Sequence, residues 1–286
     1  MDLDSPKKIK KVLKKQPAKK LGQNFLINED VVKDIIEIAE ITKKDTVLEI
    51  GPGLGAITKE LTKKAKKVVA IEKDSQLINH LNSLEYKNLT VVNDDFFNVD
   101  LDLFLEGEYK VVANLPFNAA TAIIREVLTT GGFSSISVIT QKEVAERIES
   151  KGNKENFLSV ITKVKGEPEV CRTVPRNYFW PAPRVDGAVL KIVPRLQNEN
   201  SLFYKEFFKI VEAGFRHSRK QLKNNLANFN GLTKKDVVNL LKSLDLNPKI
   251  RAEDLEVSDW EKMTKRYLTL TRKENKINQD EDTQKK

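Results

Sequence analysis

Residues 46–58 read TVLEIGPGLGAIT, an apolar run that leads through three closely spaced glycines into a helical pattern. The run is rich in β-branched and leucine side chains, as buried strands are. Gly51, Gly53 and Gly55 allow positive φ and a close approach of the backbone to a ligand. A strand, a glycine turn and a helix in this order are typical of the first unit of a doubly wound α/β sheet, in which ligands bind at the carboxyl ends of the strands.

The same alternation of short apolar runs and helical stretches continues along the chain. Further strands are expected at 67–72, 89–93, 109–114 and 135–140, with helical segments near 56–64, 74–84, 119–129 and 141–150. Because the runs are apolar throughout and joined by helices, they predict a parallel sheet covered on both faces. Two later runs, 167–174 and 185–193, are expected to add antiparallel strands at one edge. The predicted fold is therefore a doubly wound, Rossmann-like α/β sheet.

A change of pattern after residue 195 predicts a second domain. Helical patterns follow there, near 202–215, 219–229, 234–244 and 258–269, and predict a small all-helical domain over 200–271. The main domain is expected at 19–195. Both ends of the chain are polar and charged, which predicts a flexible basic arm at 1–18 and a disordered tail at 272–286.

Composition narrows the classes of function. The net charge of +9 over 286 residues indicates a polyanionic partner, most simply a nucleic acid. With Cys171 as the one cysteine, no intrachain disulfide is expected, and two histidines do not support a His-based metal cluster, so no metal site is predicted. No apolar run approaches the length of a membrane span and no apolar signal opens the chain. A cytoplasmic protein is therefore expected.

Acidic residues follow the strands at the edge where the glycine turn lies. Glu49 stands two residues before Gly51, Glu72 ends the second strand and Asp95 follows the third. An acid about 20 residues beyond a glycine turn commonly binds ribose hydroxyls. Because the carboxyl ends of parallel strands meet at one edge, we expect these acids, Gly51 and Gly53 to line one cofactor site.

Two cofactors fit such a site. The pattern G-x-G-x-x-A at 51–56 satisfies a relaxed dinucleotide fingerprint, so an NAD-dependent oxidoreductase stays open. S-adenosylmethionine has an adenosine but no pyrophosphate, and its cationic sulfonium and amino groups favour acids near the turn, such as Glu49. An oxidoreductase would also need a hydride-handling side chain near the cleft, and His80 and His217 are poorly placed for it. The pattern favours S-adenosylmethionine.

Residues 110–120 read KVVANLPFNAA, so the fourth strand ends in Asn114, Leu115, Pro116 and Phe117. The amine of an adenine is a poor nucleophile, because its lone pair is delocalised into the ring. The Asn114 side-chain oxygen and the Leu115 carbonyl would accept its two hydrogens and turn the lone pair toward a methyl donor. Pro116 fixes the local φ and leaves no competing N–H. Phe117 would stack on a flipped-out or unpaired base, which contributes about 1–3 kcal/mol.

Taken together, these motifs resemble the rRNA adenine dimethyltransferase family, and within it the KsgA-type small-subunit enzymes. The resemblance covers residues 19–270 and rests on six segments in family order: KKLGQNFL at 19–26, LEIGPGLGAIT at 48–58, NLPFNAATAII at 114–124, QKEVAERI at 141–148, VPRNYFWPAPRVDGAVLKI at 174–192 and FRHSRKQLKNNL at 215–226. It implies a class I methyltransferase fold and S-adenosylmethionine-dependent transfer of two methyl groups to each of two adjacent adenines.

The resemblance also implies a set of site residues. Cofactor contacts would come from Asn24, Leu26, Gly51, Glu72, Asp95 and Asn114, beside the Glu49 and Gly53 that the turn itself suggests. Asn114 and Leu115 would hold the target amine, and Phe179 would close the face of the base opposite Phe117. The chain departs from the family in Phe117, where these enzymes usually have Tyr, and in NAATAI at 118–123. Stacking needs only the ring, so activity is expected.

A basic segment indicates where RNA would bind. Arg216, Arg219, Lys220 and Lys223 are spaced as one face of a helix, which predicts a surface that follows phosphates.

The leading interpretation is dimethylation of adenines in the 3′-terminal hairpin loop of small-subunit rRNA, on a pre-ribosomal particle, by a monomer. The alternatives are the related large-subunit methyltransferase of the antibiotic-resistance type and a non-catalytic nucleic-acid-binding factor on the same fold.

Overall fold

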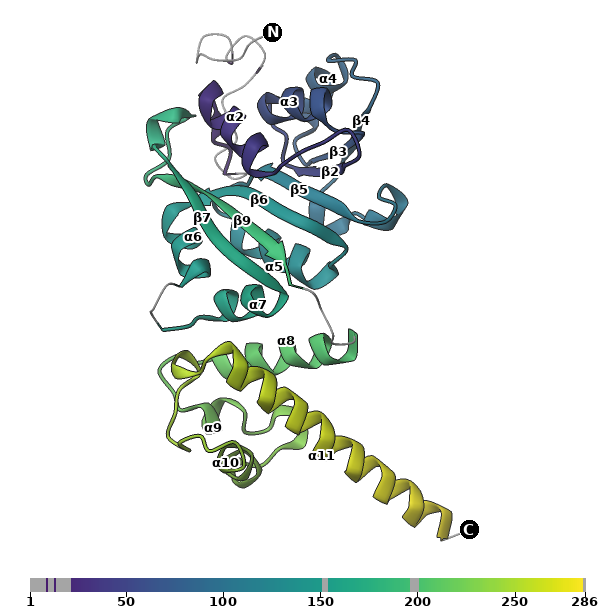
Figure 1. The fold of residues 1–286 in the computed structure, drawn as a ribbon, viewed down its shortest axis with the longest axis vertical. Helices are drawn as coiled ribbons and strands as arrows, with labels where there is room; N and C mark the ends of the chain where they lie inside the picture. Colours follow the sequence, from purple (N-terminus) through teal and green to yellow (C-terminus); the bar gives the residue numbers. More distant parts are fainter. Residues whose placement is uncertain (1–8, 10–12, 14–21, 151–153, 196–200, 285–286) are drawn as a thin grey trace. The chain divides into compact units, whose positions relative to one another are not determined.

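The computed structural model describes residues 9, 13, 22–150, 154–195 and 201–284, which fall into two compact units. The first unit lies within residues 1–149 and 165–195 and contains a seven-stranded sheet (Figure 1). Its strands are β2 (Thr46–Ile50), β3 (Lys67–Glu72), β4 (Leu89–Asn93), β5 (Tyr109–Asn114), β6 (Phe133–Gln141), β7 (Gly166–Val174) and β9 (Gly187–Pro194). Their order in the sheet is β4-β3-β2-β5-β6-β9-β7.

The sheet has the predicted doubly wound topology. Strands β2 to β6 run parallel, β9 is antiparallel to β6, and β7 is antiparallel to β9. The expected α/β class and its antiparallel edge are thus confirmed. From β2 the chain passes to β3 and β4 on one side and then returns to β5 on the other. This reversal between β2 and β5 is the switch point at which open α/β sheets bind ligands.

Helices cover both faces of the sheet (Figure 1). They are α2 (Glu29–Ile38), α3 (Ala56–Lys64), α4 (Ser75–Asn82), α5 (Ala120–Thr130) and α6 (Lys142–Glu149). Helix α2 begins at Asn28, whose side-chain oxygen accepts from the N–H of Val31 at 3.0 Å. Val31 and Ile35 are fully buried against the sheet residues Val47 and Val112, and each buried aliphatic side chain contributes about 1.5–3 kcal/mol.

A second, two-stranded sheet was not predicted. Strand β1 (Phe25–Leu26) pairs antiparallel with β8 (Phe179–Trp180), and the N–H of Ile27 donates to the carbonyl of Tyr178 at 2.9 Å. Strands of two residues are too short to show a period of two, so no sequence pattern marks them. Their pairing joins the chain near residue 25 to a segment that lies some 150 positions later.

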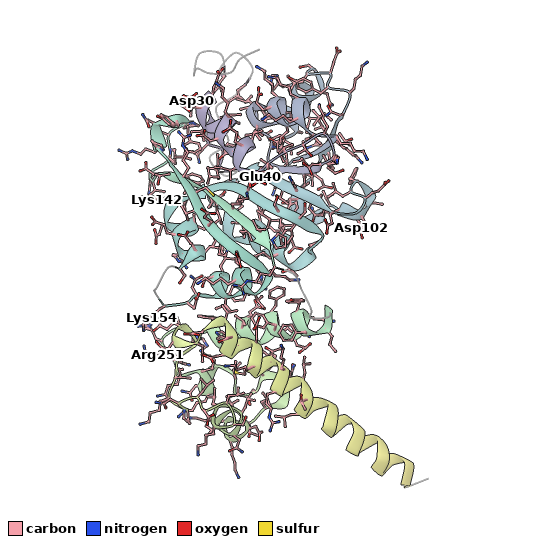
Figure 2. All side chains as sticks on the ribbon, viewed as in Figure 1. Asp30, Glu40, Asp102, Lys142, Lys154 and Arg251 are labelled. Atoms are coloured by element: carbon pink, nitrogen blue, oxygen red, sulfur yellow. The ribbon has the colours of Figure 1, made fainter. Side chains whose placement is uncertain are left out.

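The second compact unit lies within residues 150–164 and 196–286. Its helices are α7 (Phe157–Lys165, except the last residue), α8 (Ser201–Phe215), α9 (Leu222–Asn225), α10 (Lys234–Lys242) and α11 (Val257–Gln284). Trp260 is fully buried and stacks on Phe215, with ring centroids 5.6 Å apart. Lys154, labelled in Figure 2, reaches Glu253 at 2.6 Å and joins the segment before α7 to the rest of this unit. The domain roles inferred from the sequence stay predictions.

The prediction of a helix at 219–229 is wrong. Helix α8 ends at Phe215, residues 216–219 form turns, and α9 comprises only four residues. Buried Asn225 explains the break, because its Nδ2 donates to the carbonyls of Gly214 at 2.5 Å and His217 at 3.1 Å. The backbone therefore folds back on itself, and Arg216, Arg219 and Lys220 lie in an exposed turn, while Lys223 is on α9. The four cations do not form one helical face.

The C-terminal end of the chain differs from the prediction, and most of the N-terminal arm lies outside the described residues. Helix α11 continues to Gln284, where the sequence predicted disorder from residue 272, because no Gly or Pro interrupts that stretch. The predicted basic arm at 1–18 lies outside the described residues except for Ile9 and Leu13. Ile9 is buried in a cluster with Phe25 and Leu77. Within the described ranges, no helix is both long enough and apolar enough to span a membrane.

Candidate active site

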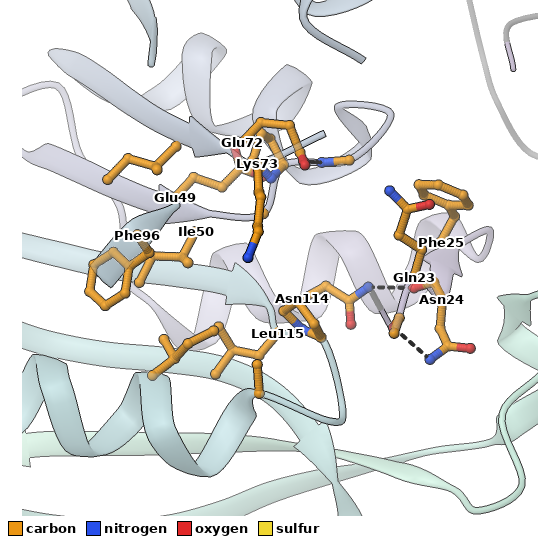
Figure 3. A pocket seen from close by; sticks show the side chains of 18 of the residues that line it. Gln23, Asn24, Phe25, Glu49, Ile50, Glu72, Lys73, Phe96, Asn114 and Leu115 are labelled. Carbon is orange, nitrogen blue, oxygen red and sulfur yellow. Dashed lines mark hydrogen bonds between the residues drawn. The ribbon is translucent and has the colours of Figure 1, made fainter. Parts of the chain in front are cut away.

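A cavity opens at the carboxyl ends of β2, β3 and β5, at the switch point of the sheet (Figure 3). The structure brings into its lining all eight residues expected to contact a cofactor: Asn24, Leu26, Glu49, Gly51, Gly53, Glu72, Asp95 and Asn114. Leu115 and Pro116 line it as well. The turn before β1 therefore meets the glycine turn and the end of β5 around one space.

The glycine turn is held by hydrogen bonds from its own N–H groups. Gly51 donates to the carbonyl of Ile71 at 2.9 Å, Gly53 to Glu72 Oε2 at 3.0 Å and Gly55 to the carbonyl of Pro52 at 2.9 Å. All three glycines have positive φ. Because these N–H groups already have acceptors, the turn offers little to a pyrophosphate, which needs free donors. This bonding favours S-adenosylmethionine over a dinucleotide.

Two buried carboxyl groups face the cavity from β2 and β3. Glu49 is 1% exposed, and its Oε2 has no hydrogen-bond partner among the described residues. Burial raises the pKa of Glu49 to about 8, and the nearby charge of Glu72 adds to this rise. Burial also raises the pKa of Glu72, although N–H groups of Asp74 and Gly53 that donate to its carboxylate oppose the rise. Such a pair favours a ligand that brings a cation, as the sulfonium and amino groups of S-adenosylmethionine do.

Asp95 lies at the rim of the cavity and is paired with a residue that the sequence reading did not single out. Lys73 Nζ lies 2.5 Å from Asp95 Oδ2, and this hydrogen bond lowers the pKa of Asp95. The Asp95 side chain also accepts from the N–H of Phe97 at 3.3 Å. A ligand that hydrogen-bonds Asp95 must therefore share that carboxylate with Lys73. The position of Lys73 directly after Glu72, at a strand end, was a signal in the sequence by which it could have been identified.

The Asn114 amide has one defined orientation. Its Nδ2 donates to the backbone carbonyl of Asn24 at 2.8 Å (Figure 3). A carbonyl only accepts, so this bond assigns the nitrogen of the amide to that side. Asn114 Oδ1 is left on the other side, buried and with no partner within the described parts of the chain. A buried acceptor without a partner costs free energy unless a ligand donates to it, so this oxygen is suited to receive an N–H group.

The backbone after Asn114 is anchored to the sheet. Leu115 is 2% exposed, and its N–H donates to the carbonyl of Ile139 on β6 at 3.0 Å. The carbonyl of Pro116 accepts from the N–H of Ala119 at 2.9 Å, which closes the turn into α5. The loop is thus a rigid extension of β5, and the positions of its backbone acceptors are set by the sheet.

Phe117 and Phe179 meet, but not as two sides of a slot. Their ring centroids are 5.7 Å apart and the rings are inclined by 68°, an edge-to-face contact. Phe179 is 2% exposed within the core, and neither ring lines the cavity. In this arrangement the two rings contact each other directly, and a base would stack on the side of Phe117 that faces away from Phe179.

Other cavity residues were not identified from the sequence. Gln23, Asn118 and the pair Phe96 and Phe97 line the space beside the predicted residues. Phe96 and Phe97 follow Asp95 directly, so their place after a strand end was a usable signal. Asn118 lies four residues beyond Asn114, and only the fold shows that it faces the turn at Gly22, where its side chain occupies the space that an added Cβ would need.

Comparison with known proteins agrees with this geometry. The model of the family described as ribosomal RNA adenine dimethylase matches residues 14–274. The chain is 40% identical over 257 residues to the ribosomal RNA small subunit methyltransferase A of Clostridium botulinum (strain Langeland), with 86% of this chain and 92% of the relative covered. The protein of the same name from Dehalococcoides mccartyi (strain CBDB1) is 37% identical, with 87% and 88% covered.

Solved structures show the same fold. A dimethyladenosine transferase from Plasmodium falciparum superposes with a TM-score of 0.67 at 25% identity, covering 82% of this chain and 94% of that one. The 23S rRNA methyltransferase ErmE reaches a TM-score of 0.66 at 24% identity, covering 85% and 99%, a likeness that concerns the fold alone. The family match and the relatives confirm the resemblance seen in the sequence: the chain belongs to the ribosomal RNA adenine dimethylase family.

Proposed function

We propose that this protein transfers methyl groups from S-adenosylmethionine to the N6 amines of two adjacent adenines in the 3′-terminal hairpin loop of small-subunit rRNA. The observation that carries the proposal is the Asn114 amide, whose buried Oδ1 is unpaired within the described residues while its Nδ2 is held by Asn24. The names of the 40%-identical relatives support the choice of small-subunit RNA.

The family and the fold imply the use of S-adenosylmethionine, which supplies an electrophilic methyl group when bound. Asn114 Oδ1 and the Leu115 carbonyl would accept the two hydrogens of the adenine amine. The lone pair of the adenine nitrogen stands roughly perpendicular to the plane of its two N–H bonds. Because the two hydrogen bonds fix that plane, they direct the lone pair toward the methyl group. No side chain has to take a proton before transfer, so positioning contributes most of the rate. A monomethylated amine offers one hydrogen, and either acceptor can hold it for the second transfer.

Phe117 would hold the target base by stacking. Replacing Phe117 with leucine removes a stack of about 1–3 kcal/mol and is expected to lower kcat/KM for RNA by about 10- to 100-fold. Phe117→Tyr keeps the ring and is expected to stay within about threefold of the parent, because stacking depends on the ring face. Steady-state kinetics with methyl-labelled cofactor measures both. If the leucine variant is as active as the parent, Phe117 does not stack on the target base.

The exposed turn at Arg216, Arg219 and Lys220 would contact phosphates of the particle. Each lost contact reduces the slope of log K against log salt by about 0.7–0.9, so Arg219→Ala together with Lys220→Ala is expected to reduce it by about 1.5. The slope comes from RNA-binding titrations at several salt concentrations. Lys235→Ala together with Lys262→Ala, two exposed lysines on α10 and α11, is the control for the loss of two charges. An unchanged slope in the double variant would place the RNA elsewhere.

The large-subunit methyltransferase remains the second candidate, because ErmE shares the fold. The experiment that separates the candidates offers three unmodified acceptors to the protein with methyl-labelled S-adenosylmethionine: small subunits, large-subunit rRNA and a DNA duplex. Label in small subunits alone is the expected result. Label in large-subunit rRNA alone would reassign the substrate, and absence of label despite cofactor binding would favour a non-catalytic binding factor.

A further inference from the structure

We propose that Gln23 is a positioning residue for methyl transfer, which sets the orientation of Asn114 through the segment that carries both Gln23 and Asn24. The inference rests on the proposed function. Residues 22–26 are called the strap here: they run from Gly22 through β1 and border the cavity with their side chains and backbone. Gln23, labelled beside Asn24 in Figure 3, is the strap residue whose side chain hydrogen-bonds Asp74.

The strap contributes an acceptor rather than a side chain to Asn114. The carbonyl of Asn24 accepts from Asn114 Nδ2 at 2.8 Å. A flipped amide would set Asn114 Oδ1 against this carbonyl, where two acceptors repel, and would present an NH₂ group to the adenine amine. The Asn24 carbonyl therefore selects the amide orientation that chemistry on an amine needs. Its selectivity depends on the carbonyl staying where it is, to a fraction of an ångström.

Gln23 ties the strap to the strand that bears Glu72. Gln23 Nε2 donates to Asp74 Oδ2 at 2.8 Å, and the N–H of Asp74 donates to Glu72 Oε1 at 2.8 Å. Asp74 is itself held, since it caps α4 by accepting from the N–H of Gln76 at 3.0 Å. The bond from Gln23 thus fixes the strap against a rigid point next to the cofactor-binding acid.

Further contacts hold the two ends of the strap. Asn24 Nδ2 donates to the carbonyl of Gly22 at 3.1 Å, which tightens the turn, and β1 pairs with β8. At Gly22, with φ of +64°, Asn118 from the loop between β5 and α5 fills the space that a Cβ would need. Between the Gly22 turn and β1, the Gln23–Asp74 bond links the strap to the acidic strand ends. Losing this bond removes a restraint on the position of the Asn24 carbonyl relative to Asn114.

The test uses the full-length protein and an exchange of bonding partners. In Gln23→Glu the new carboxylate faces Asp74 and repels it, so the strap is expected to move. In the double variant Gln23→Glu with Asp74→Asn, the new amide donates to the new carboxylate and the link returns. Asp74→Asn alone is the matched control, because asparagine also caps helices and Gln23 keeps a bond by turning its own amide.

Three quantities are measured for each variant: the single-turnover rate of methyl transfer, the Kd of S-adenosylmethionine by calorimetry, and amide hydrogen exchange at residues 24–27 without RNA. Gln23→Glu is expected to lower the rate by about 30-fold, as small displacements in active sites do, to speed the exchange, and to change Kd by less than about threefold. The double variant is expected to recover both rate and exchange.

The outcomes separate the inference from the proposed function. An unchanged rate in Gln23→Glu, or a double variant as slow as the single one, overturns the positioning role. A loss of cofactor affinity as large as the loss of rate would also overturn it and make Gln23 part of cofactor binding. If the parent protein methylates none of the acceptors, the proposed function fails, and the exchange at 24–27 still decides whether Gln23 holds the strap.

Discussion

Replacing Asn114 with alanine is expected to lower the single-turnover rate of methyl transfer by about 1,000-fold, within the range of losses seen when one preorganised hydrogen-bonding group is removed from an active site. The reason is the amide geometry: Oδ1 is the buried acceptor without a partner, held in place by the bond from Nδ2 to Asn24. Without it the adenine amine keeps a single acceptor and its lone pair is no longer aimed. The rate is measured with saturating labelled S-adenosylmethionine and unmodified small subunits.

Asn114→Asp provides the informative control for this prediction. Aspartate keeps an acceptor for the amine but loses the donor to the Asn24 carbonyl, so an oxygen would face that carbonyl and repel it. We therefore expect a large loss of rate in this variant as well. The melting temperature of Asn114→Ala should stay close to that of the parent, since the Asn114 residue as a whole is only half-buried, whereas the repulsion in Asn114→Asp should lower it. Full activity of Asn114→Ala would contradict the role assigned to the end of β5.

The second large effect concerns Glu49 and pH. Its pKa is about 8 in the folded protein against 4.5 as the ordinary value, and burial is the main cause. Between these pH values the folded state holds a proton that the unfolded state has released, so raising the pH through this window favours unfolding. The loss in free energy of unfolding is on the order of a few kcal/mol for the cofactor-free protein. Below the window both states are protonated and the effect disappears.

Glu49→Gln removes this titration, so the variant is expected to be more stable than the parent at pH 8.5 and to differ little from it at pH 4.5. Urea unfolding of the cofactor-free proteins at several pH values gives the difference, and Glu37→Gln on the exposed face of α2 is the control for the same chemical change. The same substitution should weaken S-adenosylmethionine binding by about tenfold, because an ion pair formed on binding is lost. Parallel pH curves for parent and variant would contradict a buried, protonated Glu49.

Local patterns predicted the sheet because its central strands, such as β2 and β3, are buried on both faces. A short apolar run that ends at a glycine or an acidic residue, such as Thr46–Ile50 before Gly51, is typical of a buried strand. The cofactor residues followed for the same reason, since parallel strands bring their carboxyl ends to one edge. Glu49, Glu72 and Asp95 therefore line one cavity, as expected from their places at or just beyond the carboxyl ends of three strands.

Contacts between segments that are distant in the sequence could not be predicted from local patterns. The Asn24 carbonyl that orients Asn114 is 90 residues away from it, and Gln23 is 51 residues from Asp74. No spacing in the sequence shows either bond. The prediction of a cationic helix at 215–226 was wrong for a related reason. The charges have helical spacing, but the side chain of buried Asn225 donates to two upstream carbonyls, and the chain turns there. Tertiary hydrogen bonds thus overrode local periodicity.

The most direct test of the central claim is the chemical identity of the product. Unmodified small subunits are incubated with the protein and S-adenosylmethionine, the rRNA is digested, and its nucleosides are identified by mass spectrometry, with Asn114→Ala as the inactive control. We expect N6,N6-dimethyladenosine at two adjacent positions near the 3′ end of the small-subunit rRNA. Methylation at another atom or another base would contradict the acceptor geometry of Asn114 and Leu115, and no methylated nucleoside at all would contradict the proposed activity.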